Sequence, residues 1–293
     1  GFLGTQDHFN RKYRYPIERQ QRVDLQEKLV LRTRPFILRR LKNEVAKELP
    51  KKTTIEVNID MNDAQLKLYE ALRTAMQSNV RRILAERGLK RSHIQILDAL
   101  LKLRQVCCHP RLLNLEGMNS HKIHSAKLDY LMDTLPDMLQ EGRKILIFSQ
   151  FTSMLSLIGD ALQKQGIEYV KLTGQTQKRD DVIQRFQSGE VPIFLISLKA
   201  GGVGLNLTAA DTVIHYDPWW NPAAEDQASD RAWRIGQDKP VFVYKLLMNQ
   251  SIEEKILLMQ KNKAQLAQSI LSKNSQINTS FSEDELLQLF DAT

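Results

Sequence analysis

The sequence contains few cysteines and no long hydrophobic segment. Its 293 residues include two cysteines, Cys107 and Cys108, which are adjacent and cannot form a disulfide framework. They have no partners at the spacing of a metal site, so we expect small apolar side chains at the end of a packed helix and no metal centre. No apolar run approaches membrane-spanning length, and no signal peptide opens the chain. These absences predict a soluble, intracellular protein with no membrane partner.

The composition is that of a globular protein with a mild preference for polyanions. Hydrophobic residues make up 42% of the chain and charged residues 26%, which allows a sizeable core in one large or two modest domains. Lys and Arg number 42 against 34 Asp and Glu, giving a formal net charge of +8. This charge is compatible with a nucleic-acid partner without requiring one. Because the sequence begins with Gly1 and not methionine, we expect it to belong to a longer polypeptide.

Periodicity predicts an N-terminal helical part and a C-terminal α/β part. The first 27 residues read as a connecting arm, and residues 28–49 have the pattern of a basic amphipathic helix. A half-buried strand is predicted at 53–59, followed by a helical hairpin. From Gly142 onward, strands alternate with helices, which predicts right-handed βαβ units and a parallel sheet. The predicted strands of that sheet are 144–148, 169–172, 193–196, 212–216 and 241–247; the predicted helices are 62–88, 92–106, 125–139, 152–164, 177–186, 251–271 and 281–290.

Polar and glycine-rich segments follow several predicted strands. They are Ser149–Gln150, Gly174, the loop 197–206 and the segment 217–220. Because ligands of parallel sheets bind beyond the carboxyl ends of the strands, we expect these segments to form a functional surface. Glycines in the loop would let the backbone approach a ligand, although they are also compatible with a plain turn. They do not match the Gly-x-Gly-x-x-Gly fingerprint, which disfavours a nucleotide-dependent transferase of Rossmann type.

Two arginines stand three residues apart after the segment 217–220. Asn221 and Pro222 have the pattern of a helix cap and first turn, so a helix is predicted over 223–233. That helix would carry three polar side chains on one side, Gln227, Arg231 and Arg234. A guanidinium stays charged and binds two oxygens at once, which suits a phosphoryl group in transfer. The alternative is a pair of surface arginines balanced by nearby aspartates.

Long segments in a defined order resemble one family of motor proteins. Lys144-Ile-Leu-Ile-Phe-Ser-Gln-Phe151, the loop 197–207, Asp217-Pro-Trp-Trp-Asn-Pro222 and Arg231-Ala-Trp-Arg-Ile-Gly-Gln237 resemble the second motor lobe of the SWI/SNF-like ATPases of helicase superfamily 2. The similarity extends to Arg34-Pro-Phe-Ile-Leu-Arg-Arg40, Leu103-Arg-Gln-Val-Cys107, His109-Pro110 and Ser251-Ile-Glu-Glu254. It therefore spans almost the whole chain. One departure is Trp233, which stands between the arginines where relatives usually carry histidine.

The resemblance implies an α/β fold: a RecA-like parallel sheet flanked by helices, without its own phosphate loop, and with an N-terminal helical subdomain. The implied division is a connecting arm and basic helix at 1–52, a helical insertion at 53–124, the RecA-like lobe at 125–250, and a brace helix with an acidic tail helix at 251–293.

The resemblance also implies roles for individual residues. Arg231 and Arg234 would be arginine fingers positioned by Gln227, and Gly202, Gly204 and Asn206 would couple the nucleotide to DNA. A DNA-backbone track would be formed by Ser149, Gln150, Arg179, Ser197 and Lys199. From the residues alone, the serines are equally compatible with turn caps, and Arg179 and Lys199 with solvated side chains. Trp219 and Trp220 belong to a family motif and are equally compatible with core anchors.

The chain lacks two motifs that such an ATPase needs. It has no Gly-x-x-x-x-Gly-Lys-[Ser/Thr] loop, and Asp284-Glu285 is followed by two leucines, so it does not imitate the metal-binding Asp-Glu box. ATP with Mg²⁺ would therefore be bound mainly by a preceding motor lobe of the same polypeptide, and this chain alone should hardly hydrolyse ATP.

The expected function is the C-terminal half of an ATP-dependent translocase on double-stranded DNA that remodels or displaces DNA-bound proteins. Such a protein would be DNA-associated, in the nucleoid or cytoplasm of a prokaryote or the nucleus of a eukaryote. The alternative is a non-catalytic nucleic-acid-binding or autoregulatory module of a larger assembly.

Overall fold

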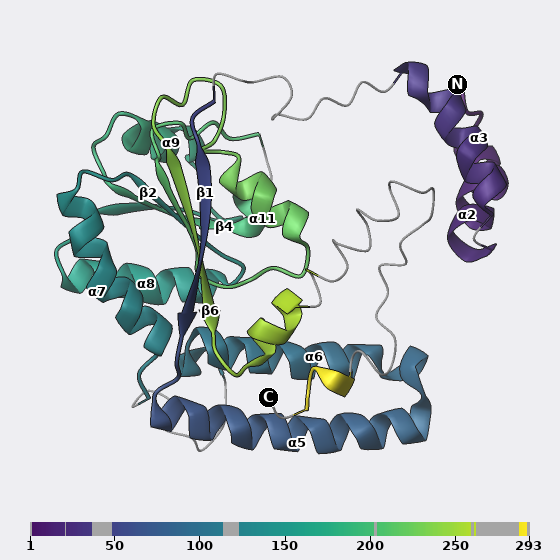
Figure 1. The fold of residues 1–293 in the computed structure, drawn as a ribbon, viewed down its shortest axis with the longest axis horizontal. Helices are drawn as coiled ribbons and strands as arrows, with labels where there is room; N and C mark the ends of the chain where they lie inside the picture. The colour runs from purple at the N-terminus through teal and green to yellow at the C-terminus, as the bar shows by residue number, and fades with distance from the viewer. Residues whose placement is uncertain are drawn as a thin grey trace. The chain divides into compact units, whose positions relative to one another are not determined.

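A computed structural model describes residues 2–20, 22–36, 49–113, 123–201, 204–258, 261 and 287–291. The chain separates into two units, and Figure 1 shows the elements of each. The first unit comprises residues 1–48 and 262–280, and the second comprises residues 49–261 and 281–293. All the predicted site residues belong to the second unit.

The described part of the first unit is helical. It contains α1 (Gln6–Phe9), a π-helical turn (Asn10–Arg14), α2 (Tyr15–Gln20), α3 (Val23–Thr33) and a 3-10 turn (Arg34–Phe36). Tyr13 is buried, and its hydroxyl accepts a hydrogen bond of 3.3 Å from Arg32 Nη1. The predicted basic helix over 28–49 is observed only in part, because α3 ends at Thr33 and residues 37–48 lie outside the described residues.

The second unit is built on a six-stranded sheet of order β1-β6-β5-β2-β4-β3, in which every neighbouring pair is parallel. The prediction of a parallel α/β sheet is confirmed. The strands are β1 (Lys52–Ile59), β2 (Ile145–Ser149), β3 (Tyr169–Leu172), β4 (Ile193–Ser197), β5 (Thr212–His215) and β6 (Val241–Met248).

Alternating side chains of the central strands face two separate apolar clusters. Ile145 and Ile147 of β2 lie in the cluster that includes α7 (Ala126–Gln140) and α8 (Thr152–Lys164). Leu146 and Phe148 lie in the cluster that includes α9 (Arg179–Gln187), α10 (Leu198–Gly201) and α11 (Pro222–Ser229). Because both faces of β2 are covered, all five of its residues are buried and its sequence is continuously apolar up to Ser149.

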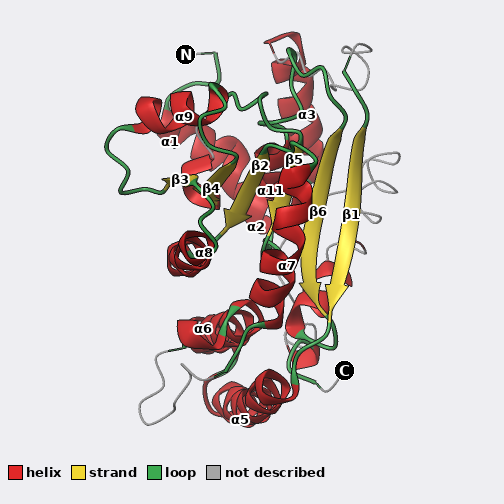
Figure 2. Cartoon of the chain, turned by 90° about the vertical axis from the view of Figure 1, so that its left-hand side faces the viewer, coloured by secondary structure: helices red, strands yellow, loops and turns green. Residues whose placement is uncertain are grey.

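Helices α5 (Asp63–Arg87) and α6 (Leu89–Cys108) form the predicted hairpin beyond the carboxyl ends of β1 and β6 (Figures 1 and 2). Asn62 caps α5, since its Oδ1 accepts a hydrogen bond of 2.9 Å from Gln65 N. Gly88 ends the helix with a φ of 67°, which glycine adopts without strain. Cys107 and Cys108 are free and fully buried at the end of α6, as predicted.

The predicted strand 53–59 is observed as β1. It pairs with β6 along its whole length, from Lys52 opposite Val241 to Ile59 opposite Met248. The sequence alone does not show that this strand joins the sheet, because its partner lies almost two hundred residues further along the chain. The four-part division of the chain remains a prediction.

The described C-terminal residues pack on α5. Ser251 caps the helical residues 252–258 through a hydrogen bond of 3.1 Å from Glu253 N to its Oγ. Residues 287–291 follow after an undescribed segment, with Leu289 and Phe290 buried and the Phe290 carbonyl accepting 2.8 Å from Arg73 Nη1. Most of the predicted helices 251–271 and 281–290 lies outside the described residues. No described helix combines the length and the apolar character needed to cross a membrane.

Candidate active site and DNA-contact residues

Several predicted site segments lie at one edge of the sheet. Ser149 ends β2, Ser197 ends β4, and Asp217 follows β5. Because the strands are parallel, their carboxyl ends meet at the same edge. The predicted convergence of these segments is confirmed.

Ser149 and Ser197 are buried, and their hydroxyl groups bond within the protein. Ser149 Oγ donates to Asp217 Oδ1 at 2.5 Å and accepts from Phe151 N at 3.1 Å. Ser197 Oγ accepts from Ala200 N at 3.4 Å. Both serines therefore hold turns after their strands, and their proposed contact with DNA remains a prediction.

Asp217 organises the turn after β2. Besides Ser149, its carboxylate accepts a hydrogen bond of 3.4 Å from Gln150 N. Burial raises the pKa of Asp217, although the Arg104 guanidinium and the Ser149 hydroxyl act in the opposite direction. The carboxylate lies 4.0 Å from Arg104 Nη2.

The remaining predicted DNA and coupling residues are at least partly accessible where the structure describes them. Gln150 and Arg179 are half-buried, and Lys199 on α10 is exposed. Gly204 and Asn206 are also exposed, whereas Gly202 lies outside the described residues. Leu207, at the end of the same loop, donates its N–H to the Arg231 carbonyl at 3.0 Å. The glycine-rich loop is therefore bonded directly to the segment that carries the two arginines.

Helix α11 begins as predicted but ends earlier. Asn221 Oδ1 accepts from Ala223 N at 3.1 Å, and Pro222 occupies the first turn. The predicted extension of this helix to residue 233 is wrong, because α11 ends at Ser229. Gln227 is exposed on the helix, while Arg231 and Arg234 lie in the turn that follows. We call residues 230–237 the arginine turn.

Contacts with distant residues end the helix. Gln237 Nε2 donates to the carbonyls of Ala210 at 2.7 Å, Ala232 at 3.0 Å and Thr208 at 3.1 Å. Gly236 has a φ of 99°, which a helix cannot contain. These bonds, with the one from Leu207, hold the arginine turn against the loop after β4, in place of another helical turn.

Arg231 and Arg234 create a site suited to an anion. The Arg231 side chain is buried, with 7% of its surface exposed, whereas Arg234 is exposed. Burial lowers the pKa of Arg231, the Arg234 cation lowers it further, and Asp230 opposes both. An anion near both arginines would relieve this repulsion, and their role toward nucleotide phosphates remains a prediction. Among the described residues, no group of three acids, histidines or cysteines could hold a metal ion.

His215 anchors the end of α11, a role that sequence patterns did not reveal. Its Nε2 shares a hydrogen bond of 2.8 Å with Ser229 Oγ, and its ring stacks on Phe148 with centroids 5.6 Å apart. The pKa of His215 is lowered to about 3, first by burial and then by Lys245 and Lys52. The imidazole is therefore neutral at pH 7. His109 behaves similarly, with its pKa lowered to about 4 by burial, Arg111 and His124.

Acidification should destabilise the fold through these two histidines. The unfolded chain binds their protons near pH 6.5, whereas the folded chain binds them only near pH 3 to 4. Between about pH 6.5 and 4, each histidine should thus lower the free energy of unfolding by about 1.4 kcal/mol per pH unit of acidification. Urea unfolding at pH 7, 6 and 5 measures this slope. His215→Gln should remove the contribution of one histidine, about 1.4 kcal/mol per pH unit, from this slope. An unchanged slope would show that His215 does not bind its proton mainly in the unfolded chain.

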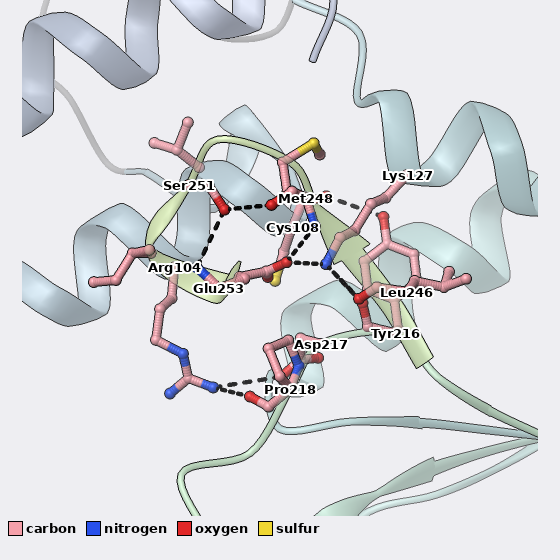
Figure 3. Close-up of polar contacts among 12 residues, drawn as sticks. Arg104, Cys108, Lys127, Tyr216, Asp217, Pro218, Leu246, Met248, Ser251 and Glu253 are labelled. Atoms are coloured by element: carbon pink, nitrogen blue, oxygen red, sulfur yellow. Dashed lines mark hydrogen bonds and ion pairs between the residues drawn. The ribbon is translucent and has the colours of Figure 1, made fainter. Parts of the chain in front are cut away.

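A buried ion pair joins α7 to the ends of β5 and β6 (Figure 3). Lys127 Nζ lies 2.5 Å from Glu253 Oε2 and also donates to the carbonyls of Tyr216 at 3.1 Å and Leu246 at 3.0 Å. The same carboxylate oxygen accepts from Met248 N at 3.0 Å. Burial alone would lower the pKa of Lys127, but Glu253 and the other neighbours outweigh it and raise the pKa. The pair fixes residues 252–258 beside the carboxyl ends of the two strands.

Arg104 of α6 holds the segment after β5. Its Nη2 donates to the Pro218 carbonyl (Figure 3). Its guanidinium lies 5.2 Å from the centroid of the Trp220 ring. Trp220 packs against the first apolar cluster and Trp219 against the second. Trp219 N donates to Glu225 Oε1 at 2.5 Å. Both tryptophans therefore pack partly buried against the core at the carboxyl edge, as core anchors would, and their role in the family motif remains a prediction.

Sequence reasoning missed Lys127 and Glu253 as structural residues. Lys127 does leave a signal, because it occupies the apolar face of its helix, one and two turns before Leu131 and Leu135. A lysine in that position predicts a buried charge that needs a partner. The sequence contains no local pattern that identifies Glu253 as that partner.

Two family models match the chain. The helicase conserved C-terminal domain matches residues 126–236, and the SNF2-related domain matches residues 1–112. Among curated relatives, a Mycoplasma pneumoniae protein named "Uncharacterized ATP-dependent helicase" is 37% identical over 99% of this chain and 27% of its own length. The ISWI chromatin-remodeling complex ATPase of Saccharomyces cerevisiae is 34% identical over 87% of this chain and 24% of its own length. The chain thus spans about a quarter of the length of these relatives.

Solved structures with the same fold include two from Sulfolobus solfataricus. A SWI2/SNF2 ATPase core in complex with double-stranded DNA is 36% identical, covers 100% of this chain and 62% of that chain, and has a TM-score of 0.67. A SWI2/SNF2 ATPase C-terminal domain is 32% identical, covers 83% of this chain and 100% of that domain, and has a TM-score of 0.64.

Proposed function

Because the chain belongs to the SWI/SNF-like ATPases as the C-terminal RecA-like lobe of their motor, we propose that it forms half of an ATP-dependent translocase on double-stranded DNA. The full-length protein remodels or displaces DNA-bound proteins and is DNA-associated in the cell. The arginine turn carries this proposal, since it holds the buried Arg231 and the exposed Arg234 three residues apart and is bonded to the loop after β4.

Arg231 and Arg234 act as arginine fingers toward ATP. The nucleotide with Mg²⁺ is held mainly by the preceding lobe of the same polypeptide, and it supplies the phosphoryl group and the metal charge when bound. The two guanidinium groups bind and orient the terminal phosphate oxygens, and their charge stabilises the negative charge of the transition state. Gln227, exposed on α11, is proposed to position the two arginines. It does so from the helix before the arginine turn, because α11 ends at Ser229. This chain alone is expected to be nearly inactive.

The DNA track divides into residues that contact the backbone and residues that hold the turns. Lys199 is exposed and Gln150 and Arg179 are half-buried, so these three side chains are proposed to contact phosphates. Ser149 and Ser197 are buried and bonded within the protein, so they are proposed to shape the turns that present the track. The DNA complex of the similar Sulfolobus core supports DNA as the ligand.

The loop 198–207 is proposed to couple DNA to ATP. It begins directly after β4 and includes the proposed DNA residue Lys199. It ends at Leu207, whose N–H donates to the Arg231 carbonyl. A shift of this loop would therefore reach the arginine turn through a backbone hydrogen bond. In the sequence, Gly202, Gly204 and Asn206 lie between these two points.

Binding of duplex DNA by the full-length protein should weaken steeply with salt and depend little on sequence. Contacts limited to phosphates release counterions, so the logarithm of the binding constant should fall with the logarithm of salt concentration by about 0.9 per contact. Fluorescence anisotropy with two unrelated duplexes over a salt series measures this slope. Lys199→Ala should reduce it by about one contact, and the exposed Lys164→Ala serves as the control. Salt-independent binding would contradict a phosphate track.

The proposed function is tested by ATP hydrolysis and protein displacement in the full-length protein. Duplex DNA should stimulate hydrolysis, and displacement of a tightly bound protein from duplex DNA should require ATP. ATP hydrolysis at the same rate with and without duplex DNA would contradict a role as a DNA translocase. Absence of hydrolysis with and without DNA would favour the non-catalytic nucleic-acid-binding or autoregulatory module.

A further inference from the structure

Trp233, between the two arginines, is bonded to the residues that precede β1. Its indole Nε1 donates to the Pro50 carbonyl at 2.7 Å, and the Lys52 ammonium lies 4.9 Å from the centroid of its ring. Lys52 Nζ also lies 3.3 Å from Asp230 Oδ1, and the two side chains are about a quarter exposed. The arginine turn thus has two polar links to the start of β1, a segment separated from it by about 180 residues.

The arginine turn is held in place by contacts on both sides of Arg234. Gln237 fixes the far end of the turn to the carbonyls of Thr208 and Ala210. Between Trp233 and Gln237 the chain is exposed, with 81% of the Ile235 side chain accessible. Trp233 is therefore a half-buried anchor directly before Arg234, and it also follows Arg231 by two residues.

At the start of β1, the residues that contact Trp233 are themselves joined to the sheet. Pro50 and Lys52 lie at the beginning of the second unit, directly after the segment that connects it to the first. The adjacent backbone is tied into the sheet, because Val241 N donates to the Lys51 carbonyl at 2.9 Å. Residues 50–52 are therefore in contact with both Trp233 and the sheet.

We propose that Trp233 is a positioning residue that latches the arginine turn to the start of β1 and thereby holds the arginine fingers in place. The proposal rests on the finger role of Arg231 and Arg234. It accounts for tryptophan at a position between two arginines, since a large ring with an N–H group can pack, accept a cation over its face and reach a carbonyl at once.

Limited trypsin digestion of the full-length protein tests the latch without ATP hydrolysis. Trypsin cleaves after Arg234, in the exposed part of the turn. Trp233→Phe keeps an aromatic ring but removes the bond to Pro50, so cleavage at this site should become about threefold to tenfold faster, the range that one hydrogen bond allows. Lys52→Met should have a similar effect, and Lys51→Met, at the exposed neighbouring lysine, should have none. Melting temperatures are recorded to confirm that each variant is folded.

Kinetics test whether the latch acts through the fingers. In the full-length protein, Trp233→Phe should lower kcat for ATP hydrolysis by roughly tenfold and leave KM for ATP unchanged, since misplacement of a catalytic group affects the transition state. In a background that lacks both fingers, Arg231→Ala with Arg234→Ala, the same substitution should lower the residual kcat no further. Trp233→His restores a ring N–H and should recover part of the loss.

The outcomes separate the latch from the proposed function. Unchanged cleavage after Arg234 in folded Trp233→Phe protein would overturn the latch, and so would an equal loss of kcat in the presence and absence of the two arginines. A wild-type protein without DNA-stimulated hydrolysis would overturn the proposed function, while the trypsin digestion would still decide whether Trp233 holds the turn.

Discussion

Replacing Arg234 with alanine in the full-length protein should lower DNA-stimulated ATP hydrolysis by on the order of a thousandfold. Arg234 is exposed in the arginine turn, so its removal creates no cavity and should leave the fold intact. Nucleotide binding should change little, because the phosphate loop is expected in the preceding lobe. The loss should therefore appear in kcat, and steady-state hydrolysis with and without duplex DNA measures it.

Two further variants sharpen the assignment of Arg234. Arg234→Lys keeps the charge but loses the planar fork, so it should recover only part of the activity. Arg185→Ala removes another exposed arginine, which is bonded to Glu190 at 2.5 Å on the surface, and should leave hydrolysis unchanged. Normal turnover of the Arg234→Ala protein would exclude Arg234 as a finger. A loss of nucleotide binding equal to the loss of turnover would show that it contributes to ground-state binding.

The substitution Lys127→Met should lower the free energy of unfolding by about 3–5 kcal/mol. It leaves the Glu253 carboxylate fully buried without its cation, and it leaves the carbonyls of Tyr216 and Leu246 without this donor. Because the pair joins α7 to the ends of β5 and β6, the loss should reach the whole sheet. Urea unfolding followed by circular dichroism measures the change.

A double variant separates the buried charge from the other contacts of Lys127. In Lys127→Met with Glu253→Leu, no unpaired charge remains, and part of the stability should return. The remaining loss in the free energy of unfolding then measures the cost of leaving the Tyr216 and Leu246 carbonyls and Met248 N without these hydrogen bonds. Lys102→Met breaks an exposed pair with Asp98 of 2.9 Å and should cost less than about 1 kcal/mol. A similar small cost for Lys127→Met would show that the buried pair does not stabilise the fold.

Local patterns predicted the secondary structure most accurately where the boundaries have local causes. The predicted helix 152–164 and strand 169–172 coincide with α8 and β3. Helix α5 begins after Asn62 and ends at Gly88, since a cap and a positive φ act within a few residues. The helix predicted over 223–233 began correctly for the same reason. Its end was wrong because the bonds that terminate it come from Leu207 and from the Gln237 contacts with Thr208 and Ala210.

The amino-acid sequence by itself determined the parallel α/β class, the two arginines, the segments at the strand ends and the resemblance to a motor lobe. These follow from residue types and short spacings. The tertiary structure decided which residues meet: β1 beside β6, Lys127 beside Glu253, Ser149 bonded to Asp217, and Trp233 bonded to Pro50. Each of these contacts joins residues at least 68 positions apart, so no local pattern encodes them. Their energies depend on burial and geometry, which exist only in the folded chain.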